Sequence, residues 1–221
     1  MDAKADAHPD TRQRLLESAC ELFAEKGFAK TTNKDICQQA GANIAAVNYY
    51  FESKEKLYAE AWRKAFHDNL CAHPPDGGVP KDAPAEQRLR GRVRALIGRI
   101  ADENNKSFLI AHKEMASPTP LLKEVMHECL GPLHEEMSKL VRELLGPQVS
   151  EQQVRFCETS VVSQCMAIVR CRRRREGREG KDAPPPVSMD EAQAYAEHVS
   201  EFSLAAIRAM RERIGGAGTD R

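Results

Sequence analysis

The chain has 221 residues, which is enough for one large helical domain or two smaller ones. It carries 33 basic and 33 acidic residues, so its overall charge does not indicate a nucleic-acid partner, and any DNA contact would depend on the local placement of charge. Aromatic residues make up 5% of the sequence, which disfavours an aromatic-rich β-sandwich, whereas long segments of Ala, Leu, Glu and Arg favour an all-α fold.

The cysteines and the N-terminal residues bear on the cellular compartment. The seven cysteines show no C-x-x-C pair and no regular spacing, which indicates reduced thiols packed as small apolar side chains. The first ten residues, MDAKADAHPD, lack the apolar core of a signal peptide. Because no run of about 18 apolar residues occurs, no membrane-spanning segment is expected. The sequence therefore predicts a cytoplasmic protein without membrane contact.

Helical spacing of apolar residues predicts four helices in the first third of the chain. A polar tail over residues 1–10 precedes a helix from Thr11 to about Lys26, and Gly27 lies just past the end of that helix. Two short helices follow, and Ser53 then caps a longer one.

A Pro- and Gly-rich stretch, HPPDGGVPKDAP at residues 73–84, is the best candidate for a domain boundary. The sequence thus predicts an N-terminal domain over residues 1–72 and a C-terminal domain over residues 85–221. Five helices are expected in the second domain, so the whole chain has about nine. Pro132 falls inside one of the five and should kink it. Their expected ranges are 85–103, 108–115, 118–146, 150–169 and 190–213.

The two short helices have the pattern of a helix-turn-helix. Thr32 can cap the first of them, with Asp35 three residues later in a capping-box-like arrangement. Gly41 supplies the backbone freedom for a tight turn, and Asn43 can cap the second helix. Ile44, Val47 and Phe51 follow at i, i+3 and i+7, which predicts one buried stripe on that second helix.

The other face of the second helix carries small residues, an amide and two phenols, without charge. Such a face suits the major groove of DNA, where bulk is penalised and amides or hydroxyls meet base edges. A three-helix bundle without a DNA role has the same spacing. The residues predicted to form the recognition surface are Thr32, Asn33, Asn43, Ala45, Ala46, Asn48, Tyr49 and Tyr50. Those predicted to face phosphates are Lys30, Thr31, Lys34 and Lys54.

An ordered set of residues resembles the TetR family of transcriptional regulators. The run from Thr11 to Leu16, followed by Ala19 and the segment LFAEKGF, resembles the first helix of that family. The segment TTNKDICQQAGANIAAVNYYFESKEKL, which ends at Leu57, is similar to its helix-turn-helix. Ala45, Ala46 and Asn48 stand where the usual family pattern has Gly, Thr and Tyr. The run ANIAAVNY instead resembles a CecR-like subgroup, as do, more faintly, the segments EMASPTP and SQC in the second domain.

The resemblance implies a fold, a mode of action and partners. It implies an all-α protein in which an N-terminal helix-turn-helix bundle precedes a C-terminal domain for ligand binding and dimerisation. It also implies a homodimer joined by a four-helix interface, a palindromic double-stranded DNA operator, and repression relieved by a small-molecule effector.

The central helices of the second domain contain sulfur-rich apolar positions with a few polar neighbours, as expected of an adaptable pocket. Packing of the core explains each of these positions equally well. The candidate ligand-binding residues are His112, Glu114, Met115, Met126, Cys129, Gln164 and Cys165.

Three further interpretations concern a metal site, a protein-binding module and a run of arginines. The pair Glu124-x-x-His127 has a spacing that di-iron bundles use twice, which leaves open an all-α metal-dependent oxidoreductase. A helical module that binds protein is a second alternative. The arginine run Arg172–Arg175 is better explained as a solvated helix end than as a nucleic-acid patch. Since the metal spacing occurs once, we expect no metal, no cofactor and no catalytic residues.

Overall fold

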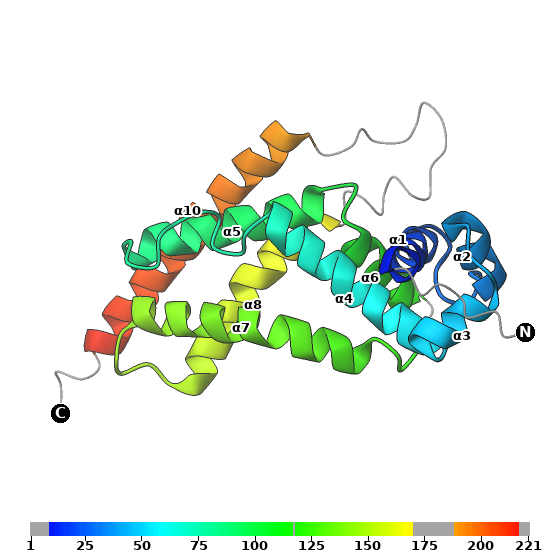
Figure 1. The fold of residues 1–221 in the computed structure, drawn as a ribbon. Coiled ribbons are helices and arrows are strands. Elements are labelled where there is room, and N and C mark those ends of the chain that lie inside the picture. The colour runs from blue at the N-terminus through cyan, green and yellow to red at the C-terminus, as the bar shows by residue number, and fades with distance from the viewer. Residues whose placement is uncertain (1–8, 117, 170–187, 217–221) are drawn as a thin grey trace, which may run out of the picture. The chain divides into compact units, whose positions relative to one another are not determined.

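The structure is a computed structural model that describes residues 9–116, 118–169 and 188–216 (Figure 1). Within these ranges it contains nine helices and no strand, which confirms the all-α prediction. The helices are α1 (Pro9–Lys26), α2 (Asn33–Ala40), α3 (Ala45–Phe51), α4 (Lys54–Ala72), α5 (Ala85–Ala101), α6 (Lys106–Ala116), α7 (Lys123–Leu145), α8 (Glu151–Met166) and α10 (Met189–Gly216).

The helices group into two compact units by packing. The head unit consists of residues 1–69 and 104–130, and the body unit consists of residues 70–103 and 131–221. The predicted domains divided the chain at residues 73–84 and so assigned α6 to the second domain. In the structure α6 and the first turns of α7 pack in the same unit as the helix-turn-helix, because their apolar side chains join its core.

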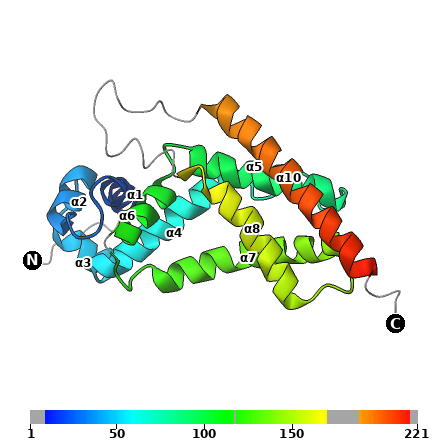
Figure 2. The ribbon, with the colours of Figure 1, turned by 180° about the vertical axis from the view of Figure 1, so that it is seen from behind.

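The core of the head unit is built by residues from α1, α2, α3, α4 and α6, which Figure 2 shows gathered around one another, together with Leu122 and Val125 at the start of α7. The apolar face predicted for each short helix supplies part of this core, since Ile36 and Ala40 of α2 and Val47 and Phe51 of α3 are all buried. The largest fully buried side chains of this unit are Leu15, Phe23, Ile36, Phe51, Leu57, Tyr58, Ile110 and Leu122.

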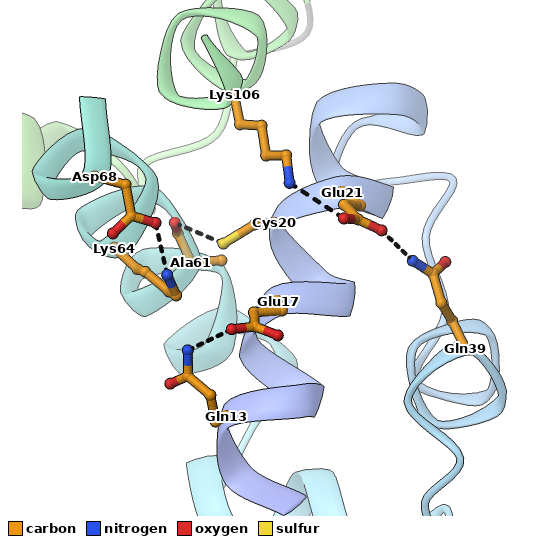
Figure 3. Close-up of polar contacts among 9 residues, drawn as sticks. All are labelled: Gln13, Glu17, Cys20, Glu21, Gln39, Ala61, Lys64, Asp68 and Lys106. Carbon is orange, nitrogen blue, oxygen red and sulfur yellow. Dashed lines mark hydrogen bonds and ion pairs between the residues drawn. The ribbon is translucent and has the colours of Figure 1, made fainter. Parts of the chain in front are cut away.

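Polar contacts also tie α1 to its neighbours (Figure 3). The Glu21 carboxylate accepts a hydrogen bond of 2.7 Å from the Gln39 amide of α2, and it also lies 3.2 Å from the Lys106 ammonium of α6. The Cys20 thiol donates to the carbonyl oxygen of Ala61 in α4, at 3.2 Å. Burial raises the pKa of Cys20 to about 11, so this thiol stays protonated at neutral pH.

In the body unit, α5 packs against both α8 and α10. Its buried residues include Leu89, Val93 and Ile97, which recur at helical spacing. Ion pairs close the edges of this packing, between Arg208 of α10 and Glu86 of α5, and between Arg88 of α5 and Glu143 of α7 at 2.5 Å. A capping box of Ser150 and Gln153 precedes α8, which begins at Glu151, one residue after the predicted start.

The Pro- and Gly-rich stretch between α4 and α5 is a folded turn rather than a loose linker. Asp76 organises the turn, since its carboxylate accepts a hydrogen bond of 2.8 Å from the Gly78 N–H and its carbonyl accepts one from Val79. Gly77 has a φ of +65° and lies against the backbone of Gly91 in α5, where a side chain would not fit. The composition that suggested a domain boundary therefore reflects close packing of two backbones.

Several predicted boundaries differ from the structure. The helix α7 begins at Lys123 rather than near residue 118, because Thr119 is held by Glu114 as described below, and α8 ends at Met166. Pro132 lies inside α7 as predicted. The helix α1 begins at Pro9 rather than at Thr11, so the last two residues of the predicted polar tail are helical. Residues 1–8 of that tail and the arginine run at residues 172–175 lie outside the described residues. Among the described residues, no helix is long and apolar enough to cross a membrane.

Two glycines of α5 offer a matched test of the close contact between α5 and the turn around Gly77. A Cβ on Gly91 would overlap the carbonyl oxygen of Asp76 and stand 2.6 Å from Cγ2 of Val79, whereas a Cβ on Gly98 meets nothing within 4 Å. We expect Gly91→Ala to lower the free energy of unfolding by about 1–3 kcal/mol, as overpacking does. We expect Gly98→Ala to raise it by about 0.5–1 kcal/mol through helix propensity. Urea denaturation measures both, and equal effects would contradict the close approach.

Candidate nucleic-acid interface

The first helix of the helix-turn-helix begins with the predicted capping box. The Asp35 N–H donates to the Thr32 hydroxyl at 3.1 Å, and the Asp35 carboxylate accepts from the Thr32 N–H at 2.9 Å and from its hydroxyl at 2.7 Å. These donors favour the charged carboxylate, so the pKa of Asp35 lies below its usual value. Two of the free N–H groups at the start of α2 are thus satisfied by its own sequence.

The turn after α2 has the left-handed conformation predicted at Gly41, with a φ of +62°. Asn43 then organises the start of α3, since its side-chain oxygen accepts from the Ala45 N–H and its carbonyl accepts from the Ala46 N–H, both at 2.9 Å. The N-cap residue itself is Ile44, so Asn43 acts one position earlier than predicted. The connection between the two helices is nevertheless fixed by local hydrogen bonds.

The buried stripe of α3 is shorter than predicted. Val47 and Phe51 are buried, but Ile44 is 59% exposed, so its assignment to the core is wrong. Its angular position on the helix fits the stripe. However, Ile44 precedes the first residue of α3 and lies about 4.5 Å along the axis before Val47, where no core side chain covers it.

The other residues of α3 are partly or largely open to solvent. Ala45, Asn48 and Tyr49 are exposed, Tyr49 to 70%, whereas Ala46 and Tyr50 are half-buried and pack against the core of the head unit. The rings of Tyr49 and Tyr50 meet edge to face, with centroids 4.9 Å apart. We call these five residues the outward face of α3. None of them carries a charge, as the sequence indicated.

The predicted phosphate-facing residues divide into three environments. Lys30 and Lys34 are exposed on either side of the start of α2. Thr31 is fully buried, and its hydroxyl donates to the Gly27 carbonyl oxygen at 2.8 Å, so it has no hydroxyl to offer a phosphate and is removed from the predicted surface. Asn33, which was predicted for the recognition surface instead, is half-buried, and its side-chain oxygen is enclosed without a hydrogen-bond partner among the described residues.

Lys54 occupies a position of its own at the start of α4. Its ammonium lies 4.2 Å from the centre of the Phe28 ring, a cation–π contact that the sequence did not reveal. Partial burial lowers the pKa of Lys54, because the charged form is desolvated there. The side chain of Phe28 thereby holds the Lys54 charge at the surface of the head unit.

The candidate ligand residues of α6 and α7 belong to the head unit. Glu114 accepts hydrogen bonds from the Tyr58 hydroxyl at 2.9 Å and from the Thr119 N–H and hydroxyl at 2.6 Å each. Its carboxylate therefore joins α4 to the segment after α6, instead of standing free to orient a ligand. Met115 is 55% exposed, so it does not line an apolar interior.

The other candidates of the head unit are less constrained. His112 is half-buried and stacks on Phe108, with ring centroids 6.3 Å apart. Met126 and Cys129 are partly buried and pack against the core of the head unit. Core packing thus explains the last two residues as well as a pocket would.

The remaining two candidates, Gln164 and Cys165, lie in the body unit at the end of α8. The Gln164 amide donates to Ser160 of its own helix at 3.2 Å, and the Gln164 carbonyl accepts a hydrogen bond from the Tyr195 hydroxyl of α10 at 2.8 Å. Cys165 is fully buried, and burial raises its pKa to about 12. The seven candidates are thus divided between two units rather than gathered in one.

The pair behind the metal interpretation, Glu124 and His127, is exposed on α7. Other acidic and histidine side chains of this helix have protein partners, since Glu128 pairs with Arg63 at 3.0 Å and Nδ1 of His134 lies 3.0 Å from the Glu158 carboxylate. Within the part of the chain that the structure describes, no group of three or more His, Cys, Asp or Glu residues is placed to hold a metal ion.

Comparisons with known proteins agree with this geometry. The family model described as "Bacterial regulatory proteins, tetR family" matches residues 15–61. The model described as "HTH-type transcriptional dual regulator CecR, C-terminal domain" matches residues 85–207, which is more than half of the chain.

Individual relatives have similar descriptions. The HTH-type transcriptional dual regulator CecR of Shigella flexneri is 27% identical over 172 residues, or 71% of this chain and 74% of that protein. The probable acrEF/envCD operon repressor of Escherichia coli strain K12 is 28% identical over 158 residues, or 67% of this chain and 62% of the repressor. Among solved structures, the fatty acid degradation regulator FadR from Bacillus halodurans shares the fold, with a TM-score of 0.64 at 14% identity over 88% of this chain and 94% of FadR.

The contact between Tyr58 and Glu114 yields a stability prediction. Tyr58→Phe removes a donor from a partly buried carboxylate oxygen, so we expect the free energy of unfolding to fall by about 1–3 kcal/mol. Tyr49→Phe, which removes an exposed hydroxyl, should change it by less than about 0.5 kcal/mol. Thermal and urea denaturation of the two variants provide the measurement. If both variants were as stable as the parent, the hydrogen bond would contribute nothing to holding α4 and α6 together.

Proposed function

This chain belongs to the TetR family of bacterial regulatory proteins and carries a C-terminal domain of the CecR type, and from this premise we propose that it is a homodimeric, cytoplasmic repressor released from a palindromic operator by a small molecule. Membership of the family makes it a DNA-binding transcriptional regulator and not an enzyme. The homodimer, the operator symmetry, the effector and the compartment are the parts that we propose.

The observation that carries the proposal is the division of α3 into two sides. Val47 and Phe51 fix one side in the core of the head unit, while Ala45, Asn48 and Tyr49 remain exposed and uncharged on the other. A helix held in this way suits entry into the major groove, with its outward face toward the base edges. We propose base contacts by Asn43 and the outward face of α3, and phosphate contacts by Lys30, Lys34, Lys54 and the exposed start of α2.

The proposed homodimer is supported by exposed apolar side chains on the last two described helices of the body unit. Phe156 and Met166 of α8 and Phe202 of α10 are exposed, although each is a large apolar residue. His198 lies on α10 between Tyr195 and Phe202, and their rings follow one another at centroid distances of 6.4 and 6.2 Å. Association of α8 and α10 with the same helices of a second copy would cover these side chains.

The proposed release by a small molecule follows from the symmetry of the dimer. Two heads related by a two-fold axis would meet successive major grooves about 34–36 Å apart. An effector bound among the central helices would move the heads off this spacing. It can shift the equilibrium between the DNA-binding and the released state only by the difference in its affinity for the two states. Of the candidate contacts, we propose the partly buried His112, Met126 and Cys129 for this role, whereas the Glu114 carboxylate is hydrogen-bonded to Tyr58 and Thr119.

The DNA contact at the start of α4 can be tested through its salt dependence. Lys54→Ala should weaken binding to all duplexes, and it should reduce the slope of log affinity against log salt by about one for each protomer. Lys139→Ala, on α7 of the body unit, should leave that slope unchanged. Fluorescence anisotropy with a genomic fragment selected by the protein, read at several salt concentrations, gives both slopes. An unchanged slope for Lys54→Ala would place its charge away from phosphates.

The proposed dimer can be tested on α10. Phe202→Glu would place an unpaired carboxylate in the contact between copies, which costs several kcal/mol, so we expect the dimer to dissociate. Lys139→Glu introduces the same side chain at an exposed site of α7 and should leave the mass unchanged. Sedimentation equilibrium distinguishes a monomer from a dimer. A stable dimer of Phe202→Glu would exclude this face of α10 from the interface.

A further inference from the structure

Ile44 is the large apolar residue that the fold leaves exposed beside the outward face of α3. A single exposed isoleucine is ordinary on a protein surface. Ile44, however, stands directly before the helix that the family membership assigns to DNA, and neither the core nor the proposed contacts explain it. Its place in the helix-turn-helix makes it a candidate for the DNA interface.

The backbone around Ile44 is fixed by its neighbours. Its dihedral angles are helical, with φ −58° and ψ −28°, and the hydrogen bonds from Ala45 and Ala46 to Asn43 enclose it. Ile44 lies one helical turn before the exposed Asn48, its i+4 neighbour, so the two side chains are adjacent along the helix. Because Ile44 is β-branched, its side chain also has few rotamers to lose on contact.

The chemistry of this surface restricts what Ile44 can recognise. Guanine is usually read by Arg or Lys, and neither occurs from Asn43 through Phe51. An aliphatic side chain has no hydrogen bond to offer, and the apolar group that a base presents in the major groove is the 5-methyl group of thymine. Asn48, one turn further on, has the amide that suits adenine.

From these observations we propose that Ile44 is a specificity-determining residue that reads a thymine in each operator half-site by contact with its 5-methyl group. The inference rests on the proposed operator binding and deepens it. Each half-site would then contain an A·T pair opposite the start of α3, and an operator with G·C at that pair would lose the contact.

Uracil provides the test because it differs from thymine only by the missing methyl group. The probe is the duplex most enriched by this protein from a random-sequence library, together with copies in which single thymines are replaced by uracil. We expect one thymine per half-site at which uracil weakens binding about fourfold, which is the value of one buried methyl group, and about 15-fold when both half-sites are changed.

A double-mutant cycle then assigns the methyl contact to Ile44. Ile44→Ala should weaken binding to the thymine duplex by at least the same factor, and uracil at that position should weaken its binding no further. Ile44→Val keeps most of the side chain, so its affinity for the thymine duplex should lie between those of the parent and of Ile44→Ala. Met189→Ala, an exposed apolar residue of α10, should keep the full response to uracil. Because Ile44 is exposed, these variants should melt at the parental temperature.

The outcomes separate this inference from the proposed function. Specific, salt-sensitive binding with equal uracil losses in the parent and in Ile44→Ala would overturn the role of Ile44 and leave the repressor proposal intact. The role of Ile44 would also be overturned, with the repressor proposal intact, if uracil weakened binding at no thymine. That result is expected if Ile44 contacts a protein partner instead of DNA. Failure to enrich any duplex would overturn the proposed operator binding and this inference with it.

Discussion

The head unit depends on the contact between Phe23 of α1 and Tyr58 of α4. Their rings meet edge to face with centroids 4.8 Å apart, and both side chains are almost completely buried. Phe28 joins them at 4.9 Å from Tyr58 and supports the Lys54 ammonium on its outer face. Burying Tyr58 also buries its hydroxyl, which must then find an acceptor. Glu114 supplies that acceptor, and this hydrogen bond adds to the apolar contacts that hold α6 with the DNA-binding helices.

The sequence predicted those features of the fold that neighbouring residues determine. Helical spacing located the helices, and the capping box predicted at Thr32 and Asp35 marked the start of α2 correctly. Its bonded residues are three positions apart, so the pattern is visible in a short window. The turn at Gly41 was predictable for the same reason, since few residues other than glycine adopt its backbone conformation.

The features that the sequence could not show involve residues far apart in the chain. Glu114 looked like a ligand contact because it is polar in an apolar stretch, but its partner Tyr58 lies 56 positions earlier. The turn around Gly77 looked like a linker because its contact with Gly91 is equally invisible in a local pattern. The prediction that Ile44 is buried was wrong for another reason. Periodicity gives the angle of a side chain around the helix axis, but it does not show where along that axis the core ends.

Because the outward face of α3 is uncharged, the residues proposed to supply affinity for DNA differ from those proposed to supply specificity for its sequence. The net charge of the chain is zero, so attraction to the DNA backbone must come from a few local cations. Of the cations proposed to contact phosphates, Lys30 and Lys34 lie at the start of α2 and Lys54 at the start of α4, outside the outward face of α3. Phosphate contacts position a protein on DNA but do not distinguish one base sequence from another. In the proposed complex, discrimination between operators would therefore fall on methyl, amide and phenol groups. Their contacts depend on fit more than on charge, so they would be less sensitive to salt than the phosphate contacts.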